Sequence, residues 1–89
     1  MKSEIIAIIA DFLEVPPEEL TDYKTLEDLD IDSLDFAEIM FEIEEKFDAS
    51  ITSDMQRHKN EIHNLGDFLR LTEELILKHR QSVPVETHG

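Results

Sequence analysis

Apolar residues recur along this chain at the three- and four-residue spacing of α-helices, and no segment keeps the strict alternation that marks a β-strand. The first such run predicts a helix over about residues 3–14, with Ser3 as its N-cap. Pro16 and Pro17 end it, because the residue before a proline avoids the helical region. A long connection follows, with a short helical turn near residues 18–20. Its scattered apolar side chains are expected to fold back over the core.

The second predicted helix carries two apolar faces rather than one. It covers residues 33–47 and begins after Asp32, a suitable N-cap. At about 100° per residue, one broad apolar arc suits the core and a narrow arc remains on another side. The broad arc holds Phe36, Ile39, Met40, Ile43 and Phe47, and the narrow arc holds Leu34, Ala37 and Phe41. An ordinary surface helix needs one apolar face, so the narrow arc, edged by acidic residues, predicts a docking surface.

A last helix is predicted from residue 64 or 65 to about residue 79, with basic residues at its C-terminal end. Residues 49–63 are ambiguous and fit a short helix capped by Thr52 or Ser53. The sequence therefore predicts an all-α fold, a small bundle of three main helices plus one or two short helices.

The chain of 89 residues is expected to hold one domain, residues 1–80, followed by a disordered tail over residues 81–89. So small a core makes a deep catalytic cavity hard to build. This size favours a carrier or binding module over a self-contained enzyme.

Acidic residues are concentrated in the first half of the chain. Residues 1–48 hold 16 Asp and Glu against three Lys, whereas residues 49–89 hold six against five Lys and Arg. The net charge of -14 disfavours nucleic acid and anionic membrane surfaces. The uneven charge is either a device for solubility or a docking face for basic partners, whose encounter it would steer.

No apolar run approaches the roughly 20 residues of a membrane span, so stable membrane insertion is not expected. The apolar stretch near the N-terminus is short and bracketed by acidic residues, which argues against a signal peptide. The absence of cysteine fits a reducing compartment. We therefore expect a cytoplasmic protein.

Most candidate sites for chemistry fail on their spacing. The acidic run from Asp28 to Asp32 suggests a calcium loop, but the required glycine and distal glutamate positions hold Ser33 and Ile39. The four histidines lack the spacing of a zinc pair. Ser33 lacks the flanking glycines of a hydrolase nucleophile, and a serine at a helix start is common for structural reasons alone. We expect no metal site and no catalytic residue.

The segment around Ser33 resembles the attachment motif of acyl carrier proteins and related carrier domains. The matching run is Leu29-Asp30-Ile31-Asp32-Ser33-Leu34-Asp35, and the family's motif centres on Asp-Ser-Leu at the start of the second helix. The resemblance continues through residues 38–47, where the family has an acidic helix ending in Glu-x-x-Phe. Helix order and spacing agree over most of residues 1–77, although the close match is confined to residues 29–47.

The resemblance implies a non-catalytic carrier that holds acyl chains as thioesters. Ser33 would take 4'-phosphopantetheine from coenzyme A through a phosphodiester, and Asp32 would help to bind the transferase with its metal. The narrow apolar arc, Leu34, Ala37 and Phe41, corresponds to the family's apolar docking contacts, and Asp35, Glu38, Glu44 and Glu45 correspond to its acidic contacts. The implied partners are a phosphopantetheinyl transferase and acyl-ACP synthetases, ketoacyl synthases or acyltransferases with basic docking patches. The protein itself is expected to be a monomer.

The chain departs from the housekeeping bacterial fatty-acid carrier at several positions. That type usually has Gly at the place of Asp30, Ala at the place of Ile31 and a smaller polar residue at the place of Phe36. Here residues 57–59 are basic, and a few extra residues precede Leu65. The run over residues 31–36 is more similar to specialised carriers, including those that deliver unusual acyl chains for lipid A.

Three functions stay open at this point. The chain is an acyl carrier for fatty-acid or specialised lipid biosynthesis, a peptidyl or polyketide carrier, or an interaction bundle without the arm. Strong acidity and short length favour the acyl carrier.

Overall fold

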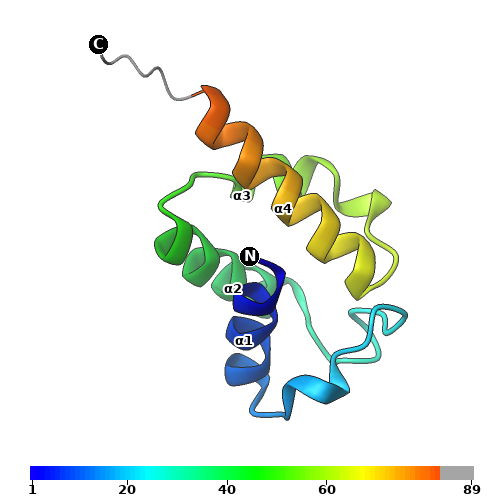
Figure 1. The fold of residues 1–89 in the computed structure, drawn as a ribbon. Coiled ribbons are helices and arrows are strands. Elements are labelled where there is room, and N and C mark those ends of the chain that lie inside the picture. Colours follow the sequence, from blue (N-terminus) through cyan, green and yellow to red (C-terminus); the bar gives the residue numbers. More distant parts are fainter. Residues whose placement is uncertain (83–89) are drawn as a thin grey trace.

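The computed structural model describes residues 1–82, and every regular element in that range is helical. Figure 1 shows the elements in chain order. They are α1 (Lys2–Leu13), η1 (Pro17–Glu19), α2 (Ser33–Phe47), α3 (Thr52–Arg57), η2 (Lys59–Glu61) and α4 (Leu65–Ser82), where η marks a short 3-10 turn. Three long helices and short helical pieces confirm the predicted all-α bundle.

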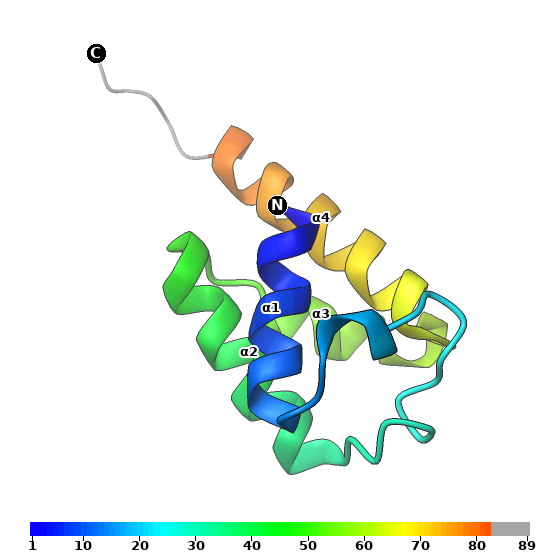
Figure 2. The ribbon, with the colours of Figure 1, turned by 60° about the horizontal axis from the view of Figure 1, so that its bottom comes forward.

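Helix α1 contacts both α2 and α4 and lies between them in Figure 2. Its buried residues are Ile5, Ile9 and Ala10. The predicted N-cap at Ser3 is wrong. Met1 is the N-cap, and its carbonyl accepts the N–H groups of Glu4 and Ile5 at 3.1 and 3.2 Å, which places Ser3 within the first turn.

The connection from α1 to α2 folds back over the bundle, as the sequence predicts. Its apolar residues Leu20, Leu26, Leu29 and Ile31 pack against the core, whereas Tyr23, which was expected to join them, is 78% exposed. Two backbone hydrogen bonds tie the connection to the start of α4: the N–H of Leu65 donates to Lys24 at 2.7 Å, and that of Gly66 donates to Asp22 at 2.8 Å. Figure 2 shows this loop beside the first turns of α4. The long loop is therefore held at both ends and in its middle.

The ambiguous segment forms α3 and η2. Ile51 is the N-cap of α3, so the predicted capping by Thr52 or Ser53 is wrong. The start of α3 is capped instead by the carboxylate of Glu44 in α2, which accepts the N–H groups of Ile51 and Thr52 at 2.7 and 2.8 Å. Met55 fills the core beneath α3 with no exposed surface.

Helix α4 extends three residues beyond the predicted end near residue 79 and closes the core from one side. Its buried residues are Leu65, Phe68, Leu69, Thr72 and Ile76. The predicted tail begins inside its last turn, and residues 83–89 of that tail lie outside the described residues. Within residues 1–82, no helix is long and apolar enough to cross a membrane.

Candidate functional site

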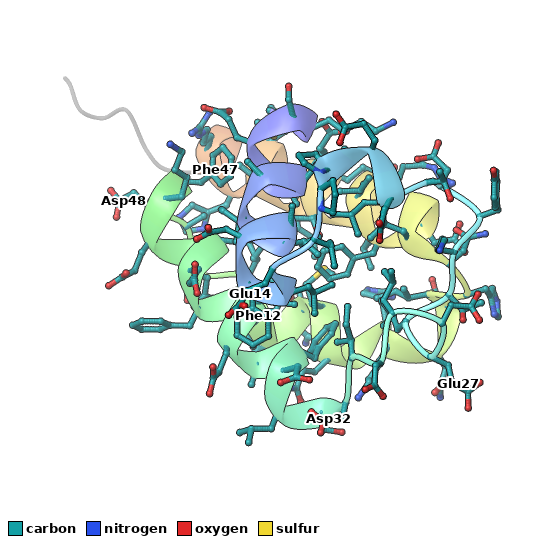
Figure 3. The ribbon with its side chains drawn as sticks, turned by 90° about the horizontal axis from the view of Figure 1, so that it is seen from below. Phe12, Glu14, Glu27, Asp32, Phe47 and Asp48 are labelled. Carbon is teal, nitrogen blue, oxygen red and sulfur yellow. The ribbon has the colours of Figure 1, made fainter. Side chains whose placement is uncertain are left out.

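The first turn of α2 is built by a reciprocal pair of carboxylates. Asp32 is the N-cap, as predicted, and its Oδ1 accepts the N–H of Asp35 at 2.8 Å. The Oδ2 of Asp35 in turn faces the N–H of Asp32 at 3.5 Å, which completes a capping box. Figure 3 shows Asp32 at the opposite end of α2 from Phe47. This arrangement sets the helix start at Ser33, the residue directly after the cap.

The backbone before α2 makes a tight turn that presents Ser33 to solvent. Ile31 donates its N–H to the carbonyl of Leu26 at 2.9 Å, and Asp30 lies in the left-handed region with φ 59°. The apolar side chains of Leu26 and Ile31 pack inward while Ser33 is exposed. A nucleophilic hydroxyl at this place is open to a large reaction partner.

A cation from a distant part of the chain stands beside this hydroxyl. The Nζ of Lys59, in η2, donates to the Oγ of Ser33 at 3.5 Å. The same ammonium lies 5.2 Å from the centroid of the Phe36 ring, one turn further along α2. Phe36 is buried and meets the ring of Phe68 edge-on at a centroid distance of 5.9 Å.

The narrow apolar arc of α2 is exposed, as its docking interpretation requires. Leu34 is 68% exposed and Phe41 60% exposed, and Ala37 between them also faces solvent. Glu38, Glu42 and Glu45 are exposed on the same helix. An apolar stripe bordered by carboxylates complements an apolar groove rimmed by Lys and Arg.

Two of the acidic residues predicted to dock partners accept backbone hydrogen bonds within the fold. Asp35 takes part in the capping box, and the half-buried Glu44 holds the start of α3. Docking by these two side chains stays a prediction. A variant at Glu44 would disturb α3 before it reported on any partner.

The acidic run before α2 is occupied by local hydrogen bonds. Asp28 and Thr25 bond reciprocally, the Oδ2 of Asp28 accepting the N–H of Thr25 at 3.1 Å and the Oγ1 of Thr25 accepting the N–H of Asp28 at 2.9 Å. Asp32 is the cap of α2. Across the described part of the chain, no three side chains of the His, Cys, Asp or Glu type gather as a metal site would need.

Comparison with known proteins identifies the family. The sequence model of the protein family described as phosphopantetheine attachment site matches residues 3–71, which form most of the bundle. The chain is 36% identical over 72 residues to a protein named acyl carrier protein from Syntrophus aciditrophicus. The aligned region covers 80% of this chain and 90% of the relative. The chain belongs to the acyl carrier protein family.

Other relatives with that name give the same result. The acyl carrier protein of Chlamydia trachomatis serovar D is 35% identical over 75 residues, 83% of this chain and 94% of the relative. That of a Sulfurovum species is 35% identical over 71 residues, 79% of this chain and 91% of the relative. The cofactor of the family is phosphopantetheine, as the resemblance implied.

The first turn of α2 fits this carrier cofactor. A phosphodiester needs an exposed hydroxyl, and Ser33 provides one. Positive potential stabilises its negative charge. The N-terminal amides of α2, which begins at Ser33, and the ammonium of Lys59 beside it provide such potential.

The turn before α2 holds one of the positions at which this chain departs from the housekeeping carriers it resembles. Carriers of the housekeeping type usually have glycine where this chain has Asp30, and that residue adopts φ 59°. Glycine takes this conformation without strain, and aspartate is among the few other residues that tolerate it.

The sequence marks Lys59 as basic and Phe36 as bulky, but it does not place either residue beside Ser33. The signal was present in the unusual charge of residues 57–59. The contact itself joins residues 26 positions apart, a separation that no helical periodicity links.

Proposed function

We propose that Ser33 is the attachment residue of this carrier and that the protein shuttles acyl groups between enzymes without catalysing reactions itself. The observation that carries the proposal is the exposed hydroxyl of Ser33 at the capped start of α2, inside the segment that the attachment-site family matches. When bound, phosphopantetheine supplies a thiol on a long flexible arm, which holds the cargo as a thioester.

The chain's own contribution to modification is to present one hydroxyl. The Ser33 oxygen attacks the phosphorus of coenzyme A that bears pantetheine. One O–P bond forms, the pyrophosphate bond breaks, and adenosine bisphosphate and the hydroxyl proton leave. The transferase supplies the base and the metal. Asp32 keeps Ser33 at the helix start and offers an exposed carboxylate next to it.

The docking face is the exposed arc of Leu34, Ala37 and Phe41 with the acids around it. Apolar side chains in the middle supply binding energy, and Glu38 and Glu45 at the edges steer basic partners. We infer that a phosphopantetheinyl transferase and acyl-transferring enzymes share this face. Each must reach the arm at the start of the same helix.

The departures named above support a proposal for the pathway. Asp30, Ile31 and Phe36 replace residues typical of the housekeeping fatty-acid carrier. These replacements favour a specialised lipid pathway, such as delivery of unusual acyl chains for lipid A, over general fatty-acid synthesis. We infer that the carrier works as a cytoplasmic monomer.

Modification in vitro tests the attachment residue. The protein without its arm is incubated with coenzyme A, Mg²⁺ and a broad-specificity phosphopantetheinyl transferase, and its intact mass is measured. We expect one arm per chain in the wild type and in Ser53→Ala, and none in Ser33→Ala. Ser53 is a matched control because it is an exposed serine in the first turn of α3. A wild type that stays unmodified, or an arm on Ser33→Ala, contradicts the proposal.

A further inference from the structure

Lys59 is placed at the candidate attachment residue by contacts on two sides. Its Nζ reaches the Oγ of Ser33 at 3.5 Å, at the outer limit of a hydrogen bond. The Phe36 ring lies beneath the ammonium, with its centroid 5.2 Å away. Ser33 and Phe36 are three residues apart, so they share one face of α2 and both point toward η2.

Phe36 is a firm support for this cation. The ring is 2% exposed and packs edge-on against Phe68 of α4. A buried ring has little freedom to move, and its face attracts an ammonium electrostatically. The long side chain of Lys59, which would otherwise sample solvent widely, is therefore biased toward Ser33.

The stacking by itself does not assign a function, because the chain contains a second example. Arg80 lies 5.9 Å from the centroid of Phe47 at the far end of α2, with no attachment residue beside it. What distinguishes Lys59 is its contact with Ser33. Within residues 1–82, Lys59 takes part in none of the ion pairs between side chains, so its ammonium has no carboxylate partner.

The surroundings of Ser33 are strongly negative, and a cation beside the serine offsets part of that charge. Asp32 and Asp35 flank the serine, and residues 1–48 carry 16 acidic side chains against three lysines. A phosphodiester formed on Ser33 adds a further negative charge to this surface. An ammonium is a compact point charge that suits phosphate oxygens, and Lys59 is already within reach of the atom to which the phosphate is bonded.

We propose that Lys59 binds the phosphate that joins the arm to Ser33, and so restrains the base of the arm on the η2 side of α2. This inference rests on the attachment proposed above. Lys59 is a positioning residue: it forms no bond with the cargo and acts through the phosphate. The upper part of the arm, beyond the phosphate, stays free to visit partners.

The test compares Lys59→Met with Lys59→Arg and with the control Lys46→Met. Methionine keeps an unbranched apolar side chain but removes the charge, and arginine restores the charge. Lys46 is an exposed lysine in the last turn of α2, far along the helix from Ser33. Each variant is loaded with the arm, and its intact mass verifies complete modification at Ser33.

The first readout is the melting temperature of the arm-bearing form minus that of the form without the arm, at low salt. We expect this difference to be about 2–6 °C larger in the wild type than in Lys59→Met, as for one exposed ion pair in a domain of this size. Lys59→Arg and Lys46→Met should behave as the wild type. High salt should reduce the difference between the wild type and Lys59→Met.

The second readout is the phosphorus NMR signal of the phosphodiester, which does not depend on catalytic activity. We expect its chemical shift to respond to salt in the wild type and to become insensitive in Lys59→Met. Equal melting differences and equal signals in fully loaded wild type and Lys59→Met would overturn the Lys59 proposal and leave the attachment at Ser33 intact. If no variant is modified at Ser33, both proposals fail. Should Lys59→Met lose its fold, Lys59→Gln serves in its place.

Discussion

The carboxylate of Glu44, in the last turns of α2, accepts the backbone N–H of Ile51 at 2.7 Å across the turn that leads into α3. The same oxygen accepts the N–H of Thr52 at 2.8 Å. A side chain that the sequence assigns to partner docking therefore fixes the position of the next helix. Because α3 carries Met55 into the core and leads into η2 with Lys59, this contact also supports the surroundings of Ser33.

We expect Glu44→Ala to lower the free energy of unfolding by about 1–2 kcal/mol, since it removes a charged cap and leaves two N–H groups without their acceptor. Glu44→Gln should lose less, because its amide oxygen still accepts. Glu45→Ala, at an exposed neighbour, should change stability by less than about 0.5 kcal/mol. Denaturant unfolding of the three variants measures these differences. Equal stability of Glu44→Ala and Glu45→Ala would show that the cap contributes nothing.

The left-handed backbone at Asp30 gives a second prediction. Its φ of 59° suits glycine and strains a residue with a Cβ. Asp30→Ala should lower the free energy of unfolding by about 1 kcal/mol, whereas Asp30→Gly should stay within about 0.5 kcal/mol of the wild type. Glu27→Ala, on the same loop and exposed, controls for the loss of an acidic side chain. If alanine is tolerated as well as glycine, strain is not the reason for the glycine in related carriers.

Charge reversal on the docking face should slow partner association without unfolding the bundle. Glu38 is exposed on α2, and exposed charges steer encounter while adding little stability. Glu38→Lys should lower the low-salt kcat/KM of a phosphopantetheinyl transferase for this substrate and weaken its salt dependence. Glu27→Lys makes the same change in net charge on the connecting loop, where Figure 3 shows Glu27 away from α2, and should have a smaller effect. Equal effects of the two reversals would mean that net charge alone matters.

The acyl cargo is expected to stabilise the bundle as it lengthens. Phe36, Met40, Ile43 and Phe47 line the core face of α2, and Leu69 and Ile76 of α4 are buried in the same cluster. A chain that enters between these helices gains up to about 0.8 kcal/mol for each buried methylene. Melting temperatures of the unacylated, short-acyl and long-acyl forms at one pH should therefore rise in that order. A flat series would show that the cargo stays in solvent.

Sequence reasoning succeeded where the determining contacts are local. The start of α2 followed from Asp32 as its N-cap, and the extent of the helix and the exposed arc of Leu34 and Phe41 followed from helical periodicity. The same reasoning misplaced the cap of α1, because the carbonyl of Met1 receives the first N–H groups and no side chain marks the start.

The remaining features depend on contacts between segments that are far apart in the chain. Glu44 reaches Thr52, eight residues on, across a turn whose path no periodicity specifies. The contact of Lys59 with Ser33 requires the position of η2 against α2, which follows only from the packed core. The sequence therefore predicted an exposed Ser33 and an exposed apolar arc on α2, but not the cation beside the serine.

Peptide mapping of the protein isolated from its native host determines whether Ser33 carries the arm in the cell. The acyl cargo is preserved, the chain is digested, and each fragment is examined by mass spectrometry for the phosphopantetheine arm. We expect the arm on the fragment that contains Ser33, with an acyl group bound as a thioester in a part of the molecules. A native protein without the arm, or an arm on a fragment that lacks Ser33, would contradict this expectation.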